Sequence, residues 1–178
     1  MTMPAFFLLA AASGLVLTPI ETPPLLTNPV FSLSTVDATG KTNMNMLTYA
    51  IPVGITPRLW AISLYRKSRT HAVWCESQTG ILQLLDELHA PLAFTLGGTS
   101  AADGSKAPSC EKLGFKWAPA PDGKEQLLPA CHAYMRLKQQ GPLIDAGEHD
   151  VAICVVEGIW KGDAQGRQLS SEILRAKV

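Results

Sequence analysis

The sequence has few cysteines, and none of them forms the close pairs that metal sites and redox motifs use. Cys75, Cys110, Cys131 and Cys154 are widely separated, with no C-x-x-C pair among them. This spacing argues against a zinc knuckle and against a dense disulfide scaffold. We therefore expect four free thiols, buried in the way that free cysteines usually are.

Net charge is also lacking, because 15 Lys and Arg residues balance 15 Asp and Glu residues. A chain without a global field is not drawn to nucleic acid or to an anionic membrane surface. We therefore expect no nucleic-acid partner, and any bound anion must be held by a local cluster of groups.

Several catalytic motifs are missing as well. No G-x-G-x-x-G follows a predicted strand, and the sequence has no Walker loop, no H-E-x-x-H and no G-x-S-x-G. The Rossmann and common hydrolase interpretations therefore have no support. The four histidines, His71, His89, His132 and His149, never stand at metal-ligand spacing, so we expect no metal site.

The apolar run at residues 6–17 is shorter than the ~20 residues that a bilayer-spanning helix needs, so we expect no membrane span. Two interpretations of residues 1–26 stay open. They are a targeting segment, although no Lys or Arg precedes the run, or an N-terminal helix or extended arm that covers the domain. Residues 27–178 are expected to form that single domain. We expect a cytoplasmic location, with export or organelle targeting through residues 1–20 as the alternative.

Short β patterns dominate the rest of the chain. Residues 31–36 alternate apolar and polar side chains, a turn follows at 37–41, and 42–50 returns as the second strand of a hairpin. Pro52 and Pro57 bracket a predicted break before a strand at 59–65. Further strands are expected at 81–87, 128–140 and 151–160, the last of them apolar on both faces and therefore interior. Within 128–140, the inward set is Cys131, Ala133, Met135 and Leu137, and the solvent-facing set is His132, Tyr134, Arg136 and Lys138.

Helices are expected only as short insertions between these strands. Ser68 or Thr70 suits the N-cap of a helix over 71–77, and further short helices are expected at 90–96, 107–113 and 170–177, with a loop at 117–124. Six or so strands with inserted short helices predict an all-β barrel. Strands and helices do not alternate regularly enough for a doubly wound parallel sheet.

The basic tip at residues 66–70 is the clearest candidate for ligand binding. Ser68 and Thr70 flank Arg69 at the expected start of a helix, where open backbone N–H groups and the helix dipole favour an anion. The motif predicts a phosphate pocket, with simple helix capping as the alternative. It lies one strand and one turn beyond the amide-rich segment 43–48, so both could grip the two ends of one elongated ligand.

Two other segments have open interpretations. His149 lies in a turn beside Gly147 and Asp150, where its side chain can point into the mouth of a pocket or cap the turn. The segment 97–100 reads GGTS, which could cradle an anion or close as a lid, but is also typical of a plain flexible loop.

At this point the sequence resembles the flavin reductase-like family of FMN-binding split-barrel proteins, from about Asn28 to Trp160. The matching elements, in chain order, are Pro29-Val30 with the strand to Val36, Gly40 with Asn43, Pro52-Val53, Pro57, Ser63-Leu64, Ser68 to His71, Glu76-Ser77, the LQLL strand at 82–85, Asp103 to Lys106, and Gly147 with His149. The order and spacing of these elements, rather than any single one, carry the resemblance.

The resemblance implies a six-stranded split barrel that forms a homodimer, with FMN (or FAD) at the subunit interface and NAD(P)H as hydride donor. By position, the ring and ribityl chain would lie against Asn43, Asn45, Met46, Leu47 and Thr48. The ribityl and phosphate groups would be held by Ser63, Leu64, Tyr65, Arg66, Ser68, Arg69 and Thr70. His149 would stand on the nicotinamide side as the catalytic residue, and Lys106 would add charge near the phosphate or the second substrate.

This chain departs from the family pattern in one relevant place. The family commonly reads N-x-M-T-x-S, whereas residues 43–48 read NMNMLT, so Met46 replaces a hydroxyl that would bond the ring. Three functions stay open: an NAD(P)H:FMN oxidoreductase, which could supply a flavin-dependent monooxygenase or another acceptor; a flavin-binding module without robust turnover; and a barrel that has lost flavin and serves in structure or binds another ligand such as haem.

Overall fold

The computed structural model describes residues 18–100 and 104–177, and its centre is one antiparallel sheet of eight strands. The sheet contains β1 (Phe31–Val36), β2 (Thr42–Leu47), β3 (Ala50–Gly54), β4 (Leu59–Tyr65), β5 (Thr79–Leu84), β8 (Ala133–Gln139), β9 (Ile144–Ala146) and β10 (His149–Lys161). A separate pair is formed by β6 (Ala118–Pro119) and β7 (Gln126–Leu127). The helices are α1 (Arg69–Ser77), α2 (Ala107–Lys112), α3 (Ser171–Lys177), the 3₁₀-helix η1 (Glu87–Leu92) and the π-helix η2 (Phe94–Gly98).

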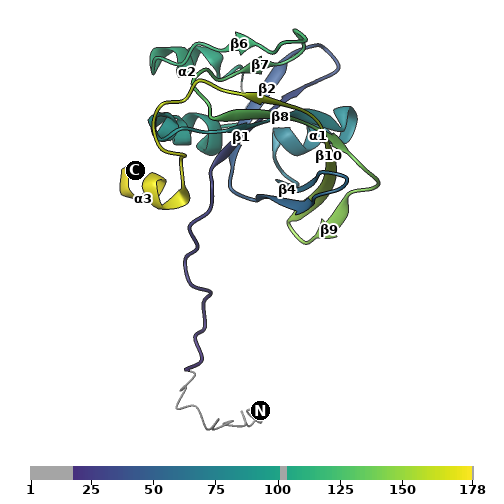
Figure 1. The fold of residues 1–178 in the computed structure, drawn as a ribbon, viewed down its shortest axis with the longest axis vertical. Coiled ribbons are helices and arrows are strands. Elements are labelled where there is room, and N and C mark those ends of the chain that lie inside the picture. Colours follow the sequence, from purple (N-terminus) through teal and green to yellow (C-terminus); the bar gives the residue numbers. More distant parts are fainter. Residues whose placement is uncertain (1–17, 101–103, 178) are drawn as a thin grey trace.

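The strand order makes the sheet curl into a half-barrel. Strands pair in the order β2-β1-β5-β8-β10-β4-β3, with β9 added to β10. The two ends of this order, β2 and β3, are separated in the chain by Thr48 and Tyr49 alone. The sheet must therefore bend until its edges nearly meet, which confirms the expected barrel class (Figure 1). The six strands of the expected barrel are all present, and β3 and β9 are short additions at its margin.

Some local elements differ from the expectation. Pro52 lies inside β3 rather than in a break, because β3 is an edge strand where a missing N–H costs no central ladder bond. The helix expected at 90–96 is replaced by η1 and η2, and Pro91 lies within η1. Ala118 and Pro119, expected in a loop, pair with β7 as strand β6.

The interior of the curled sheet is one apolar cluster closed by α1. Trp74, on the buried face of α1, packs among side chains from the strands. The strand residues of this cluster are Phe31, Leu33, Ile62, Leu64, Leu82, Met135, Leu137, Ala152 and Cys154. The indole Nε1 donates a 2.6 Å hydrogen bond to Gln139 Oε1, so the one polar atom of the ring is satisfied. This packing fixes α1 against the sheet and places the start of α1 at the edge of the barrel.

A second cluster lies against β2 and against Val30 and Leu85, which flank β1 and β5. Leu92 and Leu96, from η1 and η2, pack with Met44 of β2 and Cys110 of α2. The β6–β7 pair covers β8 in a similar way, and Tyr134 packs against it. The outer face of β8 is therefore not wet as expected. Arg136 is held by Glu125 and Asp122 there, and Lys138 is the side chain of the set that stays exposed.

The cysteines agree with the expectation in three cases out of four. Cys110, Cys131 and Cys154 are buried, and all four cysteines are free thiols. Burial raises the pKa of the Cys131 and Cys154 thiols to about 12. Cys75 is the exception, because it lies exposed on α1.

The described part of the N-terminal segment does not cover the barrel. Residues 18–27 are exposed and extend away from the domain (Figure 1). The chain joins the domain beside α3, where Asn28 N donates to Ser171 Oγ and Ser171 N donates to Asn28 O. Residues 1–17, and with them the targeting interpretation, lie outside the described residues. In the described ranges, every helix is too short or too polar to cross a bilayer.

Candidate functional site

A cleft of about 500 Å³ lies where the curled sheet nearly closes on itself. Its walls are β2, the end of β4, the start of α1, η2 and the first residue of β10. It contains all the predicted site residues except Arg66: Asn43, Asn45, Met46, Leu47, Thr48, Ser63, Leu64, Tyr65, Ser68, Arg69, Thr70, Lys106 and His149. The amide-rich strand and the basic tip therefore share one cleft.

Asn43 braces the β2 wall against α1. Its side chain is 5% exposed, and Nδ2 donates to Thr35 Oγ1 at 3.2 Å and to Thr70 Oγ1 at 3.0 Å. Both amide hydrogens are thus used within the protein. Asn43 holds the helix start beside the strand and leaves little donor capacity for a ligand.

Asn45 is the opposite case, two residues further along the same strand. Its Oδ1 atom is buried and, among the described residues, has no hydrogen-bond partner. A buried carbonyl left without a donor costs about 1–3 kcal/mol. Because Asn45 also lines the cleft, a ligand N–H group would satisfy this amide after a rotation of the side chain.

The start of α1 is capped by the first of the two predicted candidates, and the helix begins at Arg69, two residues earlier than expected, with Thr70 inside it. Ser68 is the N-cap residue, and its Oγ accepts from His71 N at 3.1 Å and donates to Tyr65 O at 2.7 Å. The Ser68 hydroxyl is therefore committed to the backbone. The N–H groups of Arg69 and Thr70, which helix geometry leaves without an intrahelical partner, remain the backbone donors at this end of the cleft.

The positive charge of the tip is partly shared with the protein itself. Arg69 Nη2 binds Asp37 Oδ2 at 2.8 Å while Arg69 also lines the cleft. Hydrogen bonds from the Thr39 hydroxyl, the Lys41 amide and Arg69 lower the pKa of Asp37 to about 2, the Thr39 bond having the largest effect. Lys67, which was not among the predicted binding residues, lines the cleft beside Arg69.

Arg66 lies outside the cleft. Its guanidinium binds Asp150 Oδ1 at 2.6 Å and Asp145 Oδ2 at 2.8 Å, and these hydrogen bonds lower the pKa of both carboxyl groups. Arg66 follows the last residue of β4, and its backbone N–H donates to Glu148 O. This contact directs the arginine to the β9–β10 turn while Tyr65, one residue earlier, lines the cleft.

Lys106 supplies a third positive side chain to the described lining, at the η2 wall. The residue is 8% exposed, its Nζ donates to Leu96 O at 2.8 Å, and burial lowers its pKa. In the described part of the chain, no carboxylate forms an ion pair with this ammonium. The described lining of the cleft contains no Asp or Glu either, so the cleft as a whole favours an anionic ligand.

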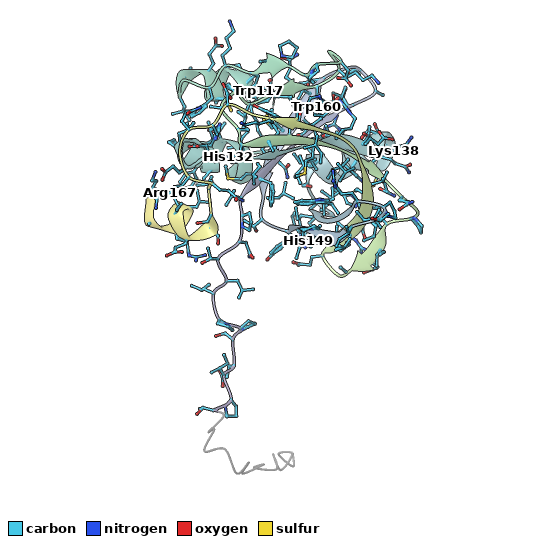
Figure 2. The ribbon with its side chains drawn as sticks, in the orientation of Figure 1. Trp117, His132, Lys138, His149, Trp160 and Arg167 are labelled. Carbon is cyan, nitrogen blue, oxygen red and sulfur yellow. The ribbon has the colours of Figure 1, made fainter. Side chains whose placement is uncertain are left out.

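His149 forms an aromatic group at the mouth of the cleft with two tyrosines. Its ring centroid lies 5.9 Å from that of Tyr49 and 5.4 Å from that of Tyr65. Figure 2 shows His149 near β9, far from Trp117. The ring packs on the aromatic side chains and lines the cleft, which agrees with the first of the two interpretations of His149.

Sequence reasoning missed several of the lining residues. Tyr49 and Leu96 line the cleft without a motif of their own. Lys67 lay within the predicted basic tip but was not assigned to the flavin, and the 97–100 segment, which had an anion cradle or a lid among its interpretations, forms part of the wall. Leu96 carried no signal, because only the fold brings η2 against β2, where Gly97 approaches Met46.

A curled antiparallel sheet with a cleft at its seam is the architecture of a split-barrel protein. The model of the flavin reductase like domain matches residues 24–171, and the chain belongs to this family. Comparison with curated proteins gives no match.

Similar solved structures agree on the fold. An FMN-binding protein from Thermus thermophilus has 14% identity and a TM-score of 0.67, covering 82% of this chain and 80% of its own. The styrene monooxygenase flavin reductase from Pseudomonas putida has 14% identity and a TM-score of 0.67, and the match covers 82% of this chain and 86% of that one. The NADH:FAD oxidoreductase from Streptomyces globisporus gives 12% and 0.66, covering 76% of both chains. A longer Sinorhizobium meliloti protein has 18% identity and a TM-score of 0.67, and 82% of this chain spans 46% of that one.

Proposed function

We propose that this protein binds FMN in the cleft and transfers hydride from NAD(P)H to the flavin. The observation that carries the proposal is the cleft itself, which has positive groups at two walls, no acidic residue in its described lining and an unsatisfied amide on its β2 wall. Its volume of about 500 Å³ lies within the range of small-molecule sites. The family and the fold both agree with a flavin ligand.

The two ends of the cleft suit the two ends of FMN. The start of α1 offers the Arg69 and Thr70 amides, with Lys67 and Arg69 alongside, and these groups suit a phosphate. The β2 wall, with Asn45, Met46 and Leu47, offers apolar surface and an amide for the ring system. FAD shares these parts of FMN and would use the same groups.

Bound flavin would supply the hydride acceptor, so the protein needs no acid–base pair of its own. The contribution of this chain is to bind, orient and shield the two rings. His149, Tyr49 and Tyr65 form a flat aromatic mouth on which a nicotinamide ring can stack. Lys106, held in a partly dry wall, would add a positive charge that favours the phosphate, the second substrate or the negative charge of reduced flavin.

The second candidate function is flavin binding without robust turnover. Met46 favours it, because its side chain packs against the outer apolar cluster and offers no hydrogen bond in place of the family hydroxyl. This function uses the same cleft and differs only in what happens when NAD(P)H is added.

We also propose that the protein acts as a homodimer. The margin formed by Tyr49, Ile51, Val53 and Ile55 is exposed, and Ile55 is 92% exposed. A run of apolar side chains along an edge strand is typical of a surface that a second copy covers. Because Tyr49 belongs to both this margin and the cleft, the partner would complete the mouth of the site.

The visible absorption spectrum of the purified protein with added FMN tests the proposal. Bound oxidised flavin gives an absorption band. Under anaerobic conditions, NADH or NADPH should reduce the flavin rapidly, and the band should then disappear. A band that persists would favour the binding module. Absence of any FMN binding would contradict both functions and leave the haem or structural alternatives. Activity of an added flavin-dependent monooxygenase, supplied with reduced flavin by this protein, would identify an acceptor.

A further inference from the structure

The exposed cysteine on α1 stands at the end of a chain of polar contacts that the flavin cleft does not use. Cys75 lies one helical turn after His71, and its Sγ is 3.8 Å from His71 Nδ1 and 3.9 Å from Nε2. His71 Nε2 lies 2.7 Å from Asp150 Oδ2. Neither Cys75 nor His71 lines the cleft of about 500 Å³.

The contact with Asp150 selects one form of the imidazole. A carboxylate accepts hydrogen bonds, so Nε2 carries the hydrogen and Nδ1 is left as the acceptor in neutral His71. Nδ1 is therefore the ring nitrogen that Asp150 does not engage, and Cys75 Sγ lies 3.8 Å from it. This is the order of groups that activates a nucleophile: a thiol, a base, and a carboxylate that orients the base.

Charged residues from other elements hold the carboxylate in place. Asp150 belongs to β10 and is also bound by Arg66, which follows β4, and Arg66 in turn binds Asp145 of β9. The side chain of Asp150 is 13% exposed, and the hydrogen bonds from Arg66 and then His71 lower its pKa. Asp150 therefore remains ionised at neutral pH and keeps His71 in one orientation.

Access completes the arrangement. Cys75 is exposed, whereas Cys110, Cys131 and Cys154 are buried. Reaction of a thiol with a reagent requires both access and a route for its proton, and Cys75 alone among the four has both.

We propose that Cys75, with His71 as base and Asp150 as positioning residue, is a site of reversible S-thiolation by low-molecular-weight disulfides. The Cys75 sulfur attacks one sulfur of the disulfide while the thiol proton passes to His71 Nδ1. The reagent's S–S bond breaks, the departing thiolate takes the proton from His71, and one disulfide has been exchanged for another. An added dithiol reverses the reaction.

The test uses the full-length protein, oxidised glutathione as the probe and intact-mass measurement over time. The matched control is the double variant Cys75→Ser/Glu76→Cys, which moves the exposed thiol one residue along α1 and away from His71. We expect one glutathionyl adduct on Cys75, removable by dithiothreitol, forming about tenfold faster at neutral pH than on the control thiol.

The variants His71→Gln and Asp150→Asn separate chemistry from structure. Gln can still donate to Asp150 but takes no proton, so we expect the adduct to form roughly tenfold more slowly at neutral pH. The rates of wild type and His71→Gln should converge in alkaline solution, where hydroxide takes the thiol proton in place of His71. A merely structural His71 would not give this convergence.

Equal rates for Cys75 and the relocated thiol would overturn the proposal, as would an unchanged pH profile in both variants. An adduct on one of the buried cysteines would also contradict it. FMN binding provides a separate readout, because the two reacting residues lie outside the cleft lining. Failure of flavin binding and failure of S-thiolation can therefore be told apart.

Discussion

Two asparagines on one strand have opposite roles at the residue scale. Asn43 donates two hydrogen bonds that tie β2 to β1 and α1, whereas Asn45 keeps a buried oxygen without a partner among the described residues. An amide that satisfies its own protein contributes to folding. An unsatisfied buried amide stabilises the fold only when a ligand bonds to it. Replacing Asn43 and replacing Asn45 should therefore have different effects on stability.

We expect Asn45→Leu to raise the thermal midpoint of the flavin-free protein and to weaken FMN binding by about tenfold, the cost of one hydrogen bond of about 1.4 kcal/mol. Thermal unfolding without flavin and an FMN fluorescence titration measure the two effects. Asn43→Leu is the matched control and should lower the midpoint, because Thr35 and Thr70 then lose a shared partner. If both variants shift the midpoint in the same direction, the distinction is wrong.

At the same scale, burial of Lys106 should make the free energy of unfolding depend on pH. Burial lowers its folded-state pKa below the ordinary 10.5, so the unfolded chain binds more protons between these two values. The burial penalty is therefore fully present below the folded pKa and is relieved as the pH rises towards 10.5. The free energy of unfolding should therefore rise over this pH range in the wild type, and we expect this rise to be missing in Lys106→Met. Urea unfolding of both proteins across the alkaline range measures it, and parallel curves would refute it.

At the scale of elements, α1 links the core of the barrel to the cleft. Trp74 fixes its buried face, and Ser68 sets where it begins by bonding to His71 N and Tyr65 O. One hydroxyl thus joins the end of β4 to the start of the helix, at the point where the proposed phosphate site lies.

We expect Ser68→Ala to lower the free energy of unfolding by about 1 kcal/mol, the usual cost of losing an N-cap, and to weaken FMN more than riboflavin, which has no phosphate. Ser77→Ala, at the other end of α1, is the control and should leave the difference between the two ligands unchanged. Chemical unfolding and paired ligand titrations give the measurements. Equal losses for both ligands would place the phosphate elsewhere.

At the scale of the whole molecule, the curl of the sheet brings its two end strands, β2 and β3, close together, and β3 keeps an exposed apolar margin. Ile51 and Val53 are 61% and 52% exposed there, next to the aromatic mouth of the cleft. Assembly and ligand binding should therefore be linked, since Tyr49, just before β3, belongs to both the apolar margin and the cleft lining.

We expect Ile51→Lys combined with Val53→Lys to convert a dimer to a monomer and to weaken FMN binding, with the fold kept. Light scattering after size exclusion measures the mass, and circular dichroism checks the fold. Ile159→Lys, an equally apolar exposed change on β10, is the control for added charge. A wild-type protein that is monomeric at micromolar concentration would contradict the dimer.

The local rules of the chain were sufficient for much of this architecture. Alternation at 31–36, the N-cap at Ser68 and the strand at 59–65 each depend on residues close together in sequence, so they could be read in advance. The family resemblance then predicted which of these elements line one cleft.

Contacts between distant segments were decided by the tertiary structure alone. Asn43 and Thr70 are 27 residues apart and share a hydrogen bond only because α1 closes the curled sheet. Arg66 and Lys67 are neighbours in the same basic tip, yet Arg66 lies outside the cleft because it forms ion pairs with Asp145 and Asp150 of β9 and β10. Periodicity and capping act over one or two turns of chain, whereas the direction of a side chain depends on which strands pair and what charge they bring.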